Sequence, residues 1–331
     1  GAFSAVSKGT VVVNGCNVIG SFEIDNVNDK VVQLNAGGMF GSAEYLRMSG
    51  SKIGVKDLST VEDRFTLEKD LITAFKVTNR VSTNLSQIKS VYLGGVVGEV
   101  KTRLLVNNAN IQILDLTVSG KDTNMAQTNA YIGGLSGSSK EMILNNVYMM
   151  NTPKTSITND GTDTATVNAL GKINSLSLGV LSGVVNNANV SNVTVGYGNK
   201  SDGLNNNEIN VNLYKRSTDN QNSSSSKIRE IFVGGMFGSA ERLKINSTSG
   251  GESLVYADIS VCNGSKREDG SIVENTSMTS TDSYCAVGGA IGKLNNYSTS
   301  SSNEYAINRL GVMGGINIDN INNPLFVGGV E

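Results

Sequence analysis

Short runs that alternate between apolar and polar residues recur along the chain, and clusters of glycine separate them. A short apolar stretch precedes each cluster, as in residues 91–93 and 231–233. An alternating stretch rich in asparagine follows it, as in residues 104–113 and 142–148. Alternation with a period of two is typical of β-strands with one buried face. The pattern therefore predicts an all-β chain of many short strands.

The glycine clusters share one motif, in which an apolar residue is followed by Gly-Gly-x-x-Gly. Copies start near residues 37, 94, 133, 179, 234, 288 and 328; the copy at 179 lacks its second glycine, and the last copy is incomplete. The repeat glycines are Gly37, Gly38, Gly41, Gly94, Gly95, Gly98, Gly133, Gly134, Gly137, Gly179, Gly183, Gly234, Gly235, Gly238, Gly288, Gly289, Gly292, Gly328 and Gly329. Each repeat is too small to bury its own core, so we expect the repeats to stack.

The spacing of the motif and its residue types suggest how the stack is built. Glycine at fixed places allows either a positive φ or a close approach between neighbouring turns of the backbone. The recurrent asparagines can form side-chain ladders along the stack. Steps of about 40 to 57 residues exceed the roughly 20 to 30 residues of one solenoid turn. Each step is therefore either two turns, or one turn interrupted by loops such as residues 219–226 and 298–303.

From these features we expect an all-β fold with a parallel β-solenoid (β-helix)-like body, in a single elongated domain over residues 1–331. One segment departs from the β pattern. Ser59 and Glu62 have the spacing of a helix capping box, and Val61, Phe65, Ile72 and Phe75 then fall on one helical face. We therefore predict one short helical insertion over about residues 60–77.

The motif units resemble the GLUG repeat of large secreted and surface proteins from bacteria and some microbial eukaryotes. In that family Gly-Gly-x-x-Gly is followed by a polar turn and a strand that carries Asn or Ser. Residues 94–113 match this pattern most closely, and residues 133–148 match it nearly as well. The longer, irregular spacing and the helical segment depart from it. The resemblance implies an adhesive, surface or matrix role outside the cell, and it supplies no catalytic residues.

Composition excludes several classes of function. The chain has no histidine, which rules out Ser-His-Asp and Cys-His catalysis and histidine-bound metals. The net charge is −2 and no basic stripe is present, so we expect no nucleic-acid partner. No apolar run approaches the roughly 20 residues of a membrane span. We expect no catalytic residue, no cofactor and no enzymatic activity.

Two weaker features are candidate sites. Asp160 and Asp163 lie in a polar stretch that could wrap a calcium ion, although a plain Asx-turn loop explains the same residues. Cys262 and Cys285 could form one disulfide, whereas Cys16 would remain unpaired. Apart from this weak calcium candidate, we expect no metal site.

Three functions remain open, and all place the protein outside the cell or at the cell surface. The first is a structural subunit of a fibre, sheath or layer, because the strand-like run at residues 10–13 and the unfinished repeat at 327–331 leave uncapped ends that favour a head-to-tail homopolymer. The second is an adhesin or carbohydrate-binding module for host or matrix glycans and proteins. Its candidate contacts are four tyrosines, although such residues are more often core or cross-strand residues, namely Tyr45, Tyr92, Tyr131 and Tyr148. The third is a polysaccharide-active β-helix enzyme, which requires converging carboxylates.

Overall fold

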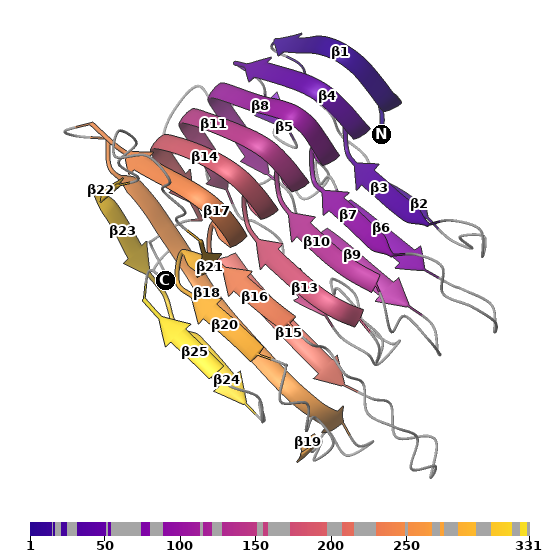
Figure 1. The fold of residues 1–331 in the computed structure, drawn as a ribbon, viewed down its shortest axis with the longest axis vertical. Coiled ribbons are helices and arrows are strands. Elements are labelled where there is room, and N and C mark those ends of the chain that lie inside the picture. Colours follow the sequence, from indigo (N-terminus) through magenta and orange to yellow (C-terminus); the bar gives the residue numbers. More distant parts are fainter. Residues whose placement is uncertain are drawn as a thin grey trace.

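The fold is a coil of β-strands whose turns stack on one another, as the computed structural model in Figure 1 shows. Every regular element among the described residues is a strand, and the parallel β-solenoid-like fold predicted from the sequence is confirmed. The structure describes residues 1–14, 16, 21–24, 32–50, 52–53, 74–79, 89–112, 115–120, 128–150, 155–157, 173–196, 207–214, 230–248, 251–266, 272–274, 284–295, 306–319 and 325–329.

The first side of the coil is a sheet of seven parallel strands, each of which ends on the first glycine of a motif. Alternate residues of each strand face the core, because side chains of a strand point to opposite faces in turn. The strands in stacking order are β3 (Gln33–Gly37), β7 (Ser90–Gly94), β10 (Thr128–Gly133), β13 (Ile173–Gly179), β16 (Glu230–Gly234), β20 (Tyr284–Gly288) and β25 (Leu325–Gly328).

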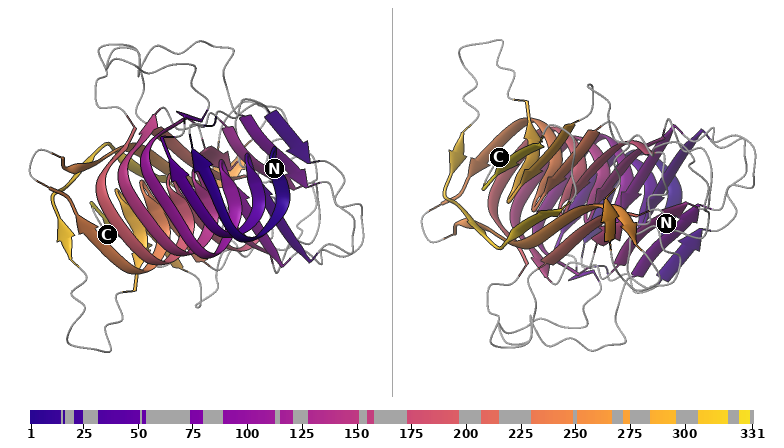
Figure 2. Two further views of the ribbon diagram at one scale, coloured as in Figure 1. Left: turned by 90° about the horizontal axis from the view of Figure 1, so that it is seen from above. Right: turned by 90° about the horizontal axis from the view of Figure 1, so that it is seen from below.

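The second side follows the glycine corner and holds the longest strands, which curve around one face of the stack in Figure 2. These strands also run parallel to their neighbours. They are β1 (Ser4–Asn14), β4 (Phe40–Ser49), β5 (Lys52–Ile53), β8 (Val97–Gln112), β11 (Ser136–Met150), β14 (Ser182–Val195), β17 (Phe237–Asn246), β21 (Ile291–Leu294), β22 (Ile307–Asn308) and β23 (Leu310–Met313).

The third side returns the chain toward the start of the next turn. Its strands are β2 (Ser21–Ile24), β6 (Ala74–Asn79), β9 (Asp115–Gly120), β12 (Thr155–Ile157), β15 (Asn207–Tyr214), β18 (Ser253–Lys266) and β24 (Ile316–Asp319). β18 starts on the second side beside β14 and then continues beside β15. The short β19 (Ile272–Glu274) pairs antiparallel with the end of β18.

Each motif step is one turn of the coil. The first glycines of successive motifs are direct neighbours on adjacent strands, from Gly37 beside Gly94 through to Gly288 beside Gly328. The copy with Val180 in place of the second glycine keeps this register, because Gly179 still lies beside Gly234. Of the two explanations for the long spacing, the structure therefore supports one turn per step. The polar stretches at 219–226 and 298–303 lie outside the described residues.

Glycine is needed at the first corner because neighbouring backbones leave no room for a side chain. A Cβ atom at Gly137 would lie 2.6 Å from the Leu93 nitrogen and 2.8 Å from the Gly98 and Tyr131 oxygens. No real Cβ atom approaches backbone so closely. The described glycines with positive φ, which include Gly50, lie outside the motif. The close-approach explanation is therefore confirmed and the positive-φ explanation is wrong.

The second corner is a bend inside the long second-side strands, before the chain reaches the third side, and it carries the predicted asparagine ladder. Asn108, Asn146 and Asn192 occupy equivalent places on successive turns, with φ of 50°, 53° and 53°. Asn146 Nδ2 donates to Asn108 Oδ1 at 3.0 Å, and Asn192 Nδ2 donates to Asn146 Oδ1 at 3.1 Å. We call these three residues the Asn ladder. Asparagine suits the corner because it adopts the left-handed region more readily than most residues.

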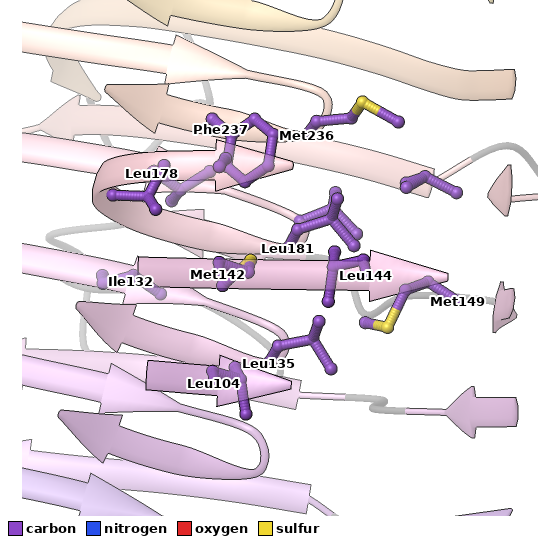
Figure 3. Packing of buried hydrophobic residues seen from close by; sticks show 14 of the residues in the cluster. Leu104, Ile132, Leu135, Met142, Leu144, Met149, Leu178, Leu181, Met236 and Phe237 are labelled. Carbon is purple, nitrogen blue, oxygen red and sulfur yellow. The ribbon is translucent and has the colours of Figure 1, made fainter. Parts of the chain in front are cut away.

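The interior of the coil is filled by columns of apolar side chains, one from each turn (Figure 3). Leu135, Leu181 and Met236 stand at the same place in three successive motifs and are completely buried. Burial of such columns is the main favourable contribution to the stability of a stacked repeat, because a single turn has no core of its own. The core thus runs continuously along the stack.

The predicted helix over residues 60–77 is wrong where the structure describes it. Residues 74–77 belong to β6, which pairs in parallel with β2 and β9. Phe75 and Val77 alternate with polar residues, and they lie in register with Phe22 and Ile24 of β2. Phe75 therefore follows the period-two pattern of a strand and not the helical spacing predicted for it. Residues 60–73 lie outside the described part of the chain.

Candidate functional site: the two ends of the coil

Three core columns can be followed from the first described turn to the last, and only their C-terminal members are exposed. Their inner members are at most 1% exposed. The first column is Val13, Met48, Val106, Leu144, Val190, Ile245 and Ile307. The second is Leu34, Val91, Ala130, Leu176, Ile231, Cys285 and Leu325, and the third is Ala36, Leu93, Ile132, Leu178, Val233, Val287 and Val327.

At the C-terminal end of the stack the last member of each column is exposed. Ile307 is 38% exposed, Leu325 is 41% exposed and Val327 is 54% exposed. We call these three residues the C-terminal end face. β25 pairs with β20 on one edge, and no described strand pairs with its other edge. The end face therefore combines exposed apolar side chains with a strand edge that no other strand of the described residues covers.

The N-terminal end of the stack is formed by β1, β2 and β3. β1 pairs with β4, β2 with β6 and β3 with β7, and none of the three has a second partner among the described strands. The column residues here are more covered than at the other end, since Val13 is 4% and Ala36 is 3% exposed, while Leu34 is partly buried. We call Val13, Leu34 and Ala36 the N-terminal end face. The two ends are thus chemically similar but differ in how far they are covered.

The first residues of the chain occupy a motif corner that the sequence analysis missed. Ala2 N donates to Gly38 O at 2.6 Å and Phe3 N donates to Met39 O at 3.0 Å, as Gly38 and Met39 do to the next turn. Gly1 and Ala2 therefore take the places of the first and second motif glycines. The Phe3 ring lies edge-to-face on Phe40, with centroids 5.9 Å apart. Only Gly1 matches the motif, and one glycine is too weak a signal to identify this copy.

The outer face of the first side carries a pair of stacked tyrosines. The rings of Tyr92 and Tyr131 lie on adjacent strands, 5.0 Å apart and 12° from parallel. Both are partly exposed, and burial raises the pKa of the Tyr131 hydroxyl. Of the other candidate tyrosines, Tyr45 lies under the Arg103 guanidinium, 6.0 Å from the ring centroid. The sequence candidates Tyr92 and Tyr131 are therefore cross-strand neighbours that still present ring surface to solvent.

Three carboxylates on the second side have structural partners. Glu141 Oε2 accepts from Arg103 Nε at 2.5 Å, and this hydrogen bond and the charge of Glu141 raise the pKa of Arg103. Glu99 Oε2 accepts from the side-chain amides of Gln33 and Asn35. Glu44 Oε2 accepts from Gly9 N at 2.6 Å. These contacts link neighbouring turns of the coil.

The structure bears on only one of the two weaker site predictions. Asp160 and Asp163 lie outside the described residues, so the calcium candidate stays a prediction. The disulfide is not formed: Cys285 is a free thiol in the core, in the seven-stranded sheet, whereas Cys262 belongs to β18. Burial raises the pKa of Cys285 to about 12. Cys16 is also free, as expected for the odd cysteine.

Comparisons with known proteins identify no relative of this chain. No protein-family model, no curated protein and no solved structure matches this chain. In the described part of the chain, no cluster of three or more Cys, Asp or Glu side chains is arranged to hold a metal ion. The described residues also contain no helix with the length and apolar character needed to cross a membrane.

Proposed function

We propose that this protein is a structural subunit that acts outside the cell or at its surface, and that its coils stack head to tail into a fibre, sheath or layer. The parallel stacking of its turns in one register carries this proposal, because each turn buries its apolar columns only when another turn covers it. Side chains of the same columns are at most 1% exposed inside the stack but 38% to 54% exposed at its end. Covering them with a further turn removes apolar surface from water, which favours association.

The parallel strands support the same proposal. A turn that stacks on an open edge continues the backbone hydrogen bonds of the sheet, and head-to-tail contacts between unlike ends produce open filaments. The resemblance of the motif to GLUG repeats favours a location outside the cell. The carboxylates that pair with Arg103, Gly9 and the amides of Gln33 and Asn35 favour a structural rather than an enzymatic role.

Electron microscopy and light scattering of the purified chain over a range of concentrations test the proposal. We expect filaments or sheets above a critical concentration, with a mass that increases with protein concentration. A chain that stays monomeric and monodisperse at high concentration would contradict self-assembly.

A second candidate function is glycan adhesion, and the Tyr92–Tyr131 pair favours it. Two parallel rings on an open sheet face offer a flat apolar surface of the kind that can stack on a sugar ring. A glycan array tests this candidate with the parent chain and with Tyr131→Ala. Binding that is lost in Tyr131→Ala but kept in Tyr45→Ala would support adhesion through this pair, whereas an array without any binding would count against it.

A further inference from the structure

One lateral row on the outer face of the first side brings two tyrosines together. The row follows the register of successive strands through Asn35, Tyr92, Tyr131, Ser177, Phe232 and Ala286. Tyr92 and Tyr131 are direct partners, and residues without a ring flank them on both sides. Among the described residues of this row, each of the two phenol rings therefore has the other as its only aromatic neighbour.

The fold holds the two rings close and nearly parallel. Their centroids are 5.0 Å apart and their planes differ by 12°. The parallel pairing of β7 with β10 fixes their register. Tyr131 also has a side-chain hydrogen bond with Asn129, whose Oδ1 accepts from Ser175 Oγ at 2.9 Å. The strands themselves therefore bring the rings together, and no rearrangement of the chain is needed.

Packing in this row does not require a hydroxyl group. Phe232 occupies the same row, is only 6% exposed, and lies under the Lys293 ammonium, which is 4.6 Å from the ring centroid. Tyr92 and Tyr131 are partly exposed instead, so a small oxidant in solution reaches the pair. A phenol differs chemically from the phenyl ring of Phe232 because it readily gives up one electron together with one proton.

We propose that Tyr92 and Tyr131 form an oxidation site, at which a peroxidase-type one-electron oxidant couples the two rings into dityrosine. Each phenol loses one electron and one proton, and the two phenoxyl radicals join through a carbon–carbon bond between ring positions next to the hydroxyls. The hydrogens on those two carbons then transfer to the two oxygens as protons, which restores both phenols. Hydrogen peroxide is the terminal oxidant, because it accepts the two electrons and two protons and leaves as two molecules of water.

The fixed pairing of the rings favours this coupling over coupling to other tyrosines. Two reacting groups held side by side have an effective concentration far above that of a second chain in dilute solution. Tyr45 is the contrasting case, because its register partners are Thr10 and Arg103. We therefore expect the bond to form within one chain, and we expect Tyr45 to take no part in it.

The new bond ties two successive turns of the coil together covalently. Cys285, which lies in the same sheet, is a free thiol and makes no such tie. A cross-link between residues 92 and 131 restricts the unfolded chain, as a disulfide does. The inference relies on the proposed location outside the cell for its oxidant, but it does not rely on head-to-tail assembly, because both rings belong to one chain.

Treatment of the dilute, purified chain with a peroxidase and hydrogen peroxide tests the site. Cleavage by trypsin after Lys and Arg places Tyr92 in the peptide 90–101 and Tyr131 in the peptide 122–140. We expect mass spectrometry to find these two peptides joined, with the mass of two hydrogen atoms lost from their sum, and we expect dityrosine fluorescence. A parallel reaction with N-acetyltyrosine checks that the oxidant is active. If that reaction proceeds and the joined peptide is absent, the proposal is wrong.

Conservative variants distinguish this pair from the other tyrosines. Tyr92→Phe and Tyr131→Phe keep the ring but lack the hydroxyl, so each should lower dityrosine fluorescence at least about fivefold and abolish the joined peptide. Tyr45→Phe is the matched control and should leave both unchanged. Circular dichroism checks that each variant is folded. Unchanged fluorescence in Tyr131→Phe, or an equal loss in Tyr45→Phe, would contradict the site.

Stability provides a second measurement. The oxidised parent chain should unfold at a higher urea concentration than the untreated chain, whereas treated Tyr131→Phe should show no such increase. An equal increase in both would show that oxidation elsewhere is responsible. The outcomes also separate this site from the proposed function: a chain that assembles without forming the joined peptide contradicts only the oxidation site, and a chain that forms the peptide but stays monomeric contradicts only self-assembly.

Discussion

Two of the corners in each turn change the chain direction by different physical means. At the first corner the motif glycines pack against the backbone of neighbouring strands, as Gly183 does against the Gly137 and Ser177 oxygens. At the second corner the backbone adopts a positive φ, and the Asn ladder adds side-chain hydrogen bonds between turns. The first corner therefore requires the absence of a side chain, while the second requires a particular backbone conformation that several residues can adopt.

The largest expected effect comes from adding one methyl group at the first corner. In Gly183→Ala the new Cβ would lie 2.7 Å from the Gly137 oxygen and 2.8 Å from the Ser177 oxygen. Both contacts are with backbone inside the stack, so neighbouring turns must separate. We expect the free energy of unfolding to fall by more than about 3 kcal/mol, or folding to fail. Urea denaturation followed by circular dichroism measures the loss.

The chain itself provides the control for this substitution. Ala5 occupies the place of Gly41 on the first described turn, where it is exposed, and no described strand lies on the outer side of β1. Ala5→Gly should therefore lower the free energy of unfolding by only about 0.4–1 kcal/mol, because glycine gives the unfolded chain more conformational freedom. A Gly183→Ala variant as stable as Ala5→Gly would show that the first corner does not depend on close packing.

Substitutions at the second corner should lower the free energy of unfolding less than Gly183→Ala does at the first. Asn146→Ala removes two ladder hydrogen bonds and places alanine at a φ of 53°. Lost hydrogen bonds at an exposed site and the left-handed strain together should cost about 2 kcal/mol. Asn146→Gly removes the same hydrogen bonds without the strain, so it should cost about 1 kcal/mol less than alanine. Equal losses in the two variants, measured by urea denaturation, would show that backbone strain contributes nothing here.

The difference between the corners also explains what could be predicted from the sequence. The motif glycines repeat because every inner turn has the same steric demand, so Gly94 and Gly133 were sufficient to predict stacked turns. The Asn ladder could be predicted as well, since it uses the same residue at Asn108, Asn146 and Asn192. Strand β6 was missed because Phe75 fits a period of two and a helical spacing equally well over so short a segment. The corner at Gly1 was missed because an end turn lacks the packing that requires the other glycines.

Arg309 occupies the second corner with a φ of 57°, on a later turn than the Asn ladder. A long side chain is strained in this region, so Arg309→Gly should raise the free energy of unfolding by about 0.5–1 kcal/mol. Asn308→Gly is the control, because Asn308 lies in β22, where glycine should lower stability by about the same amount. The melting temperatures of the two variants should shift in opposite directions. A shift of both melting temperatures in the same direction would show that the positive φ of Arg309 does not reduce stability.

The smallest effect is expected where the Asn ladder stops. Gly50 has a φ of 58°, lies one turn before Asn108, and donates from its backbone nitrogen to Asn107 O at 3.2 Å. No atom would crowd a Cβ at this position. Gly50→Asn should therefore extend the ladder by one residue and raise the free energy of unfolding by about 0.5 kcal/mol, while Gly50→Ala should lower it by about 1 kcal/mol through strain alone. If both variants lose stability equally, the ladder hydrogen bonds do not stabilise the second corner, and its asparagines serve only to adopt the positive φ.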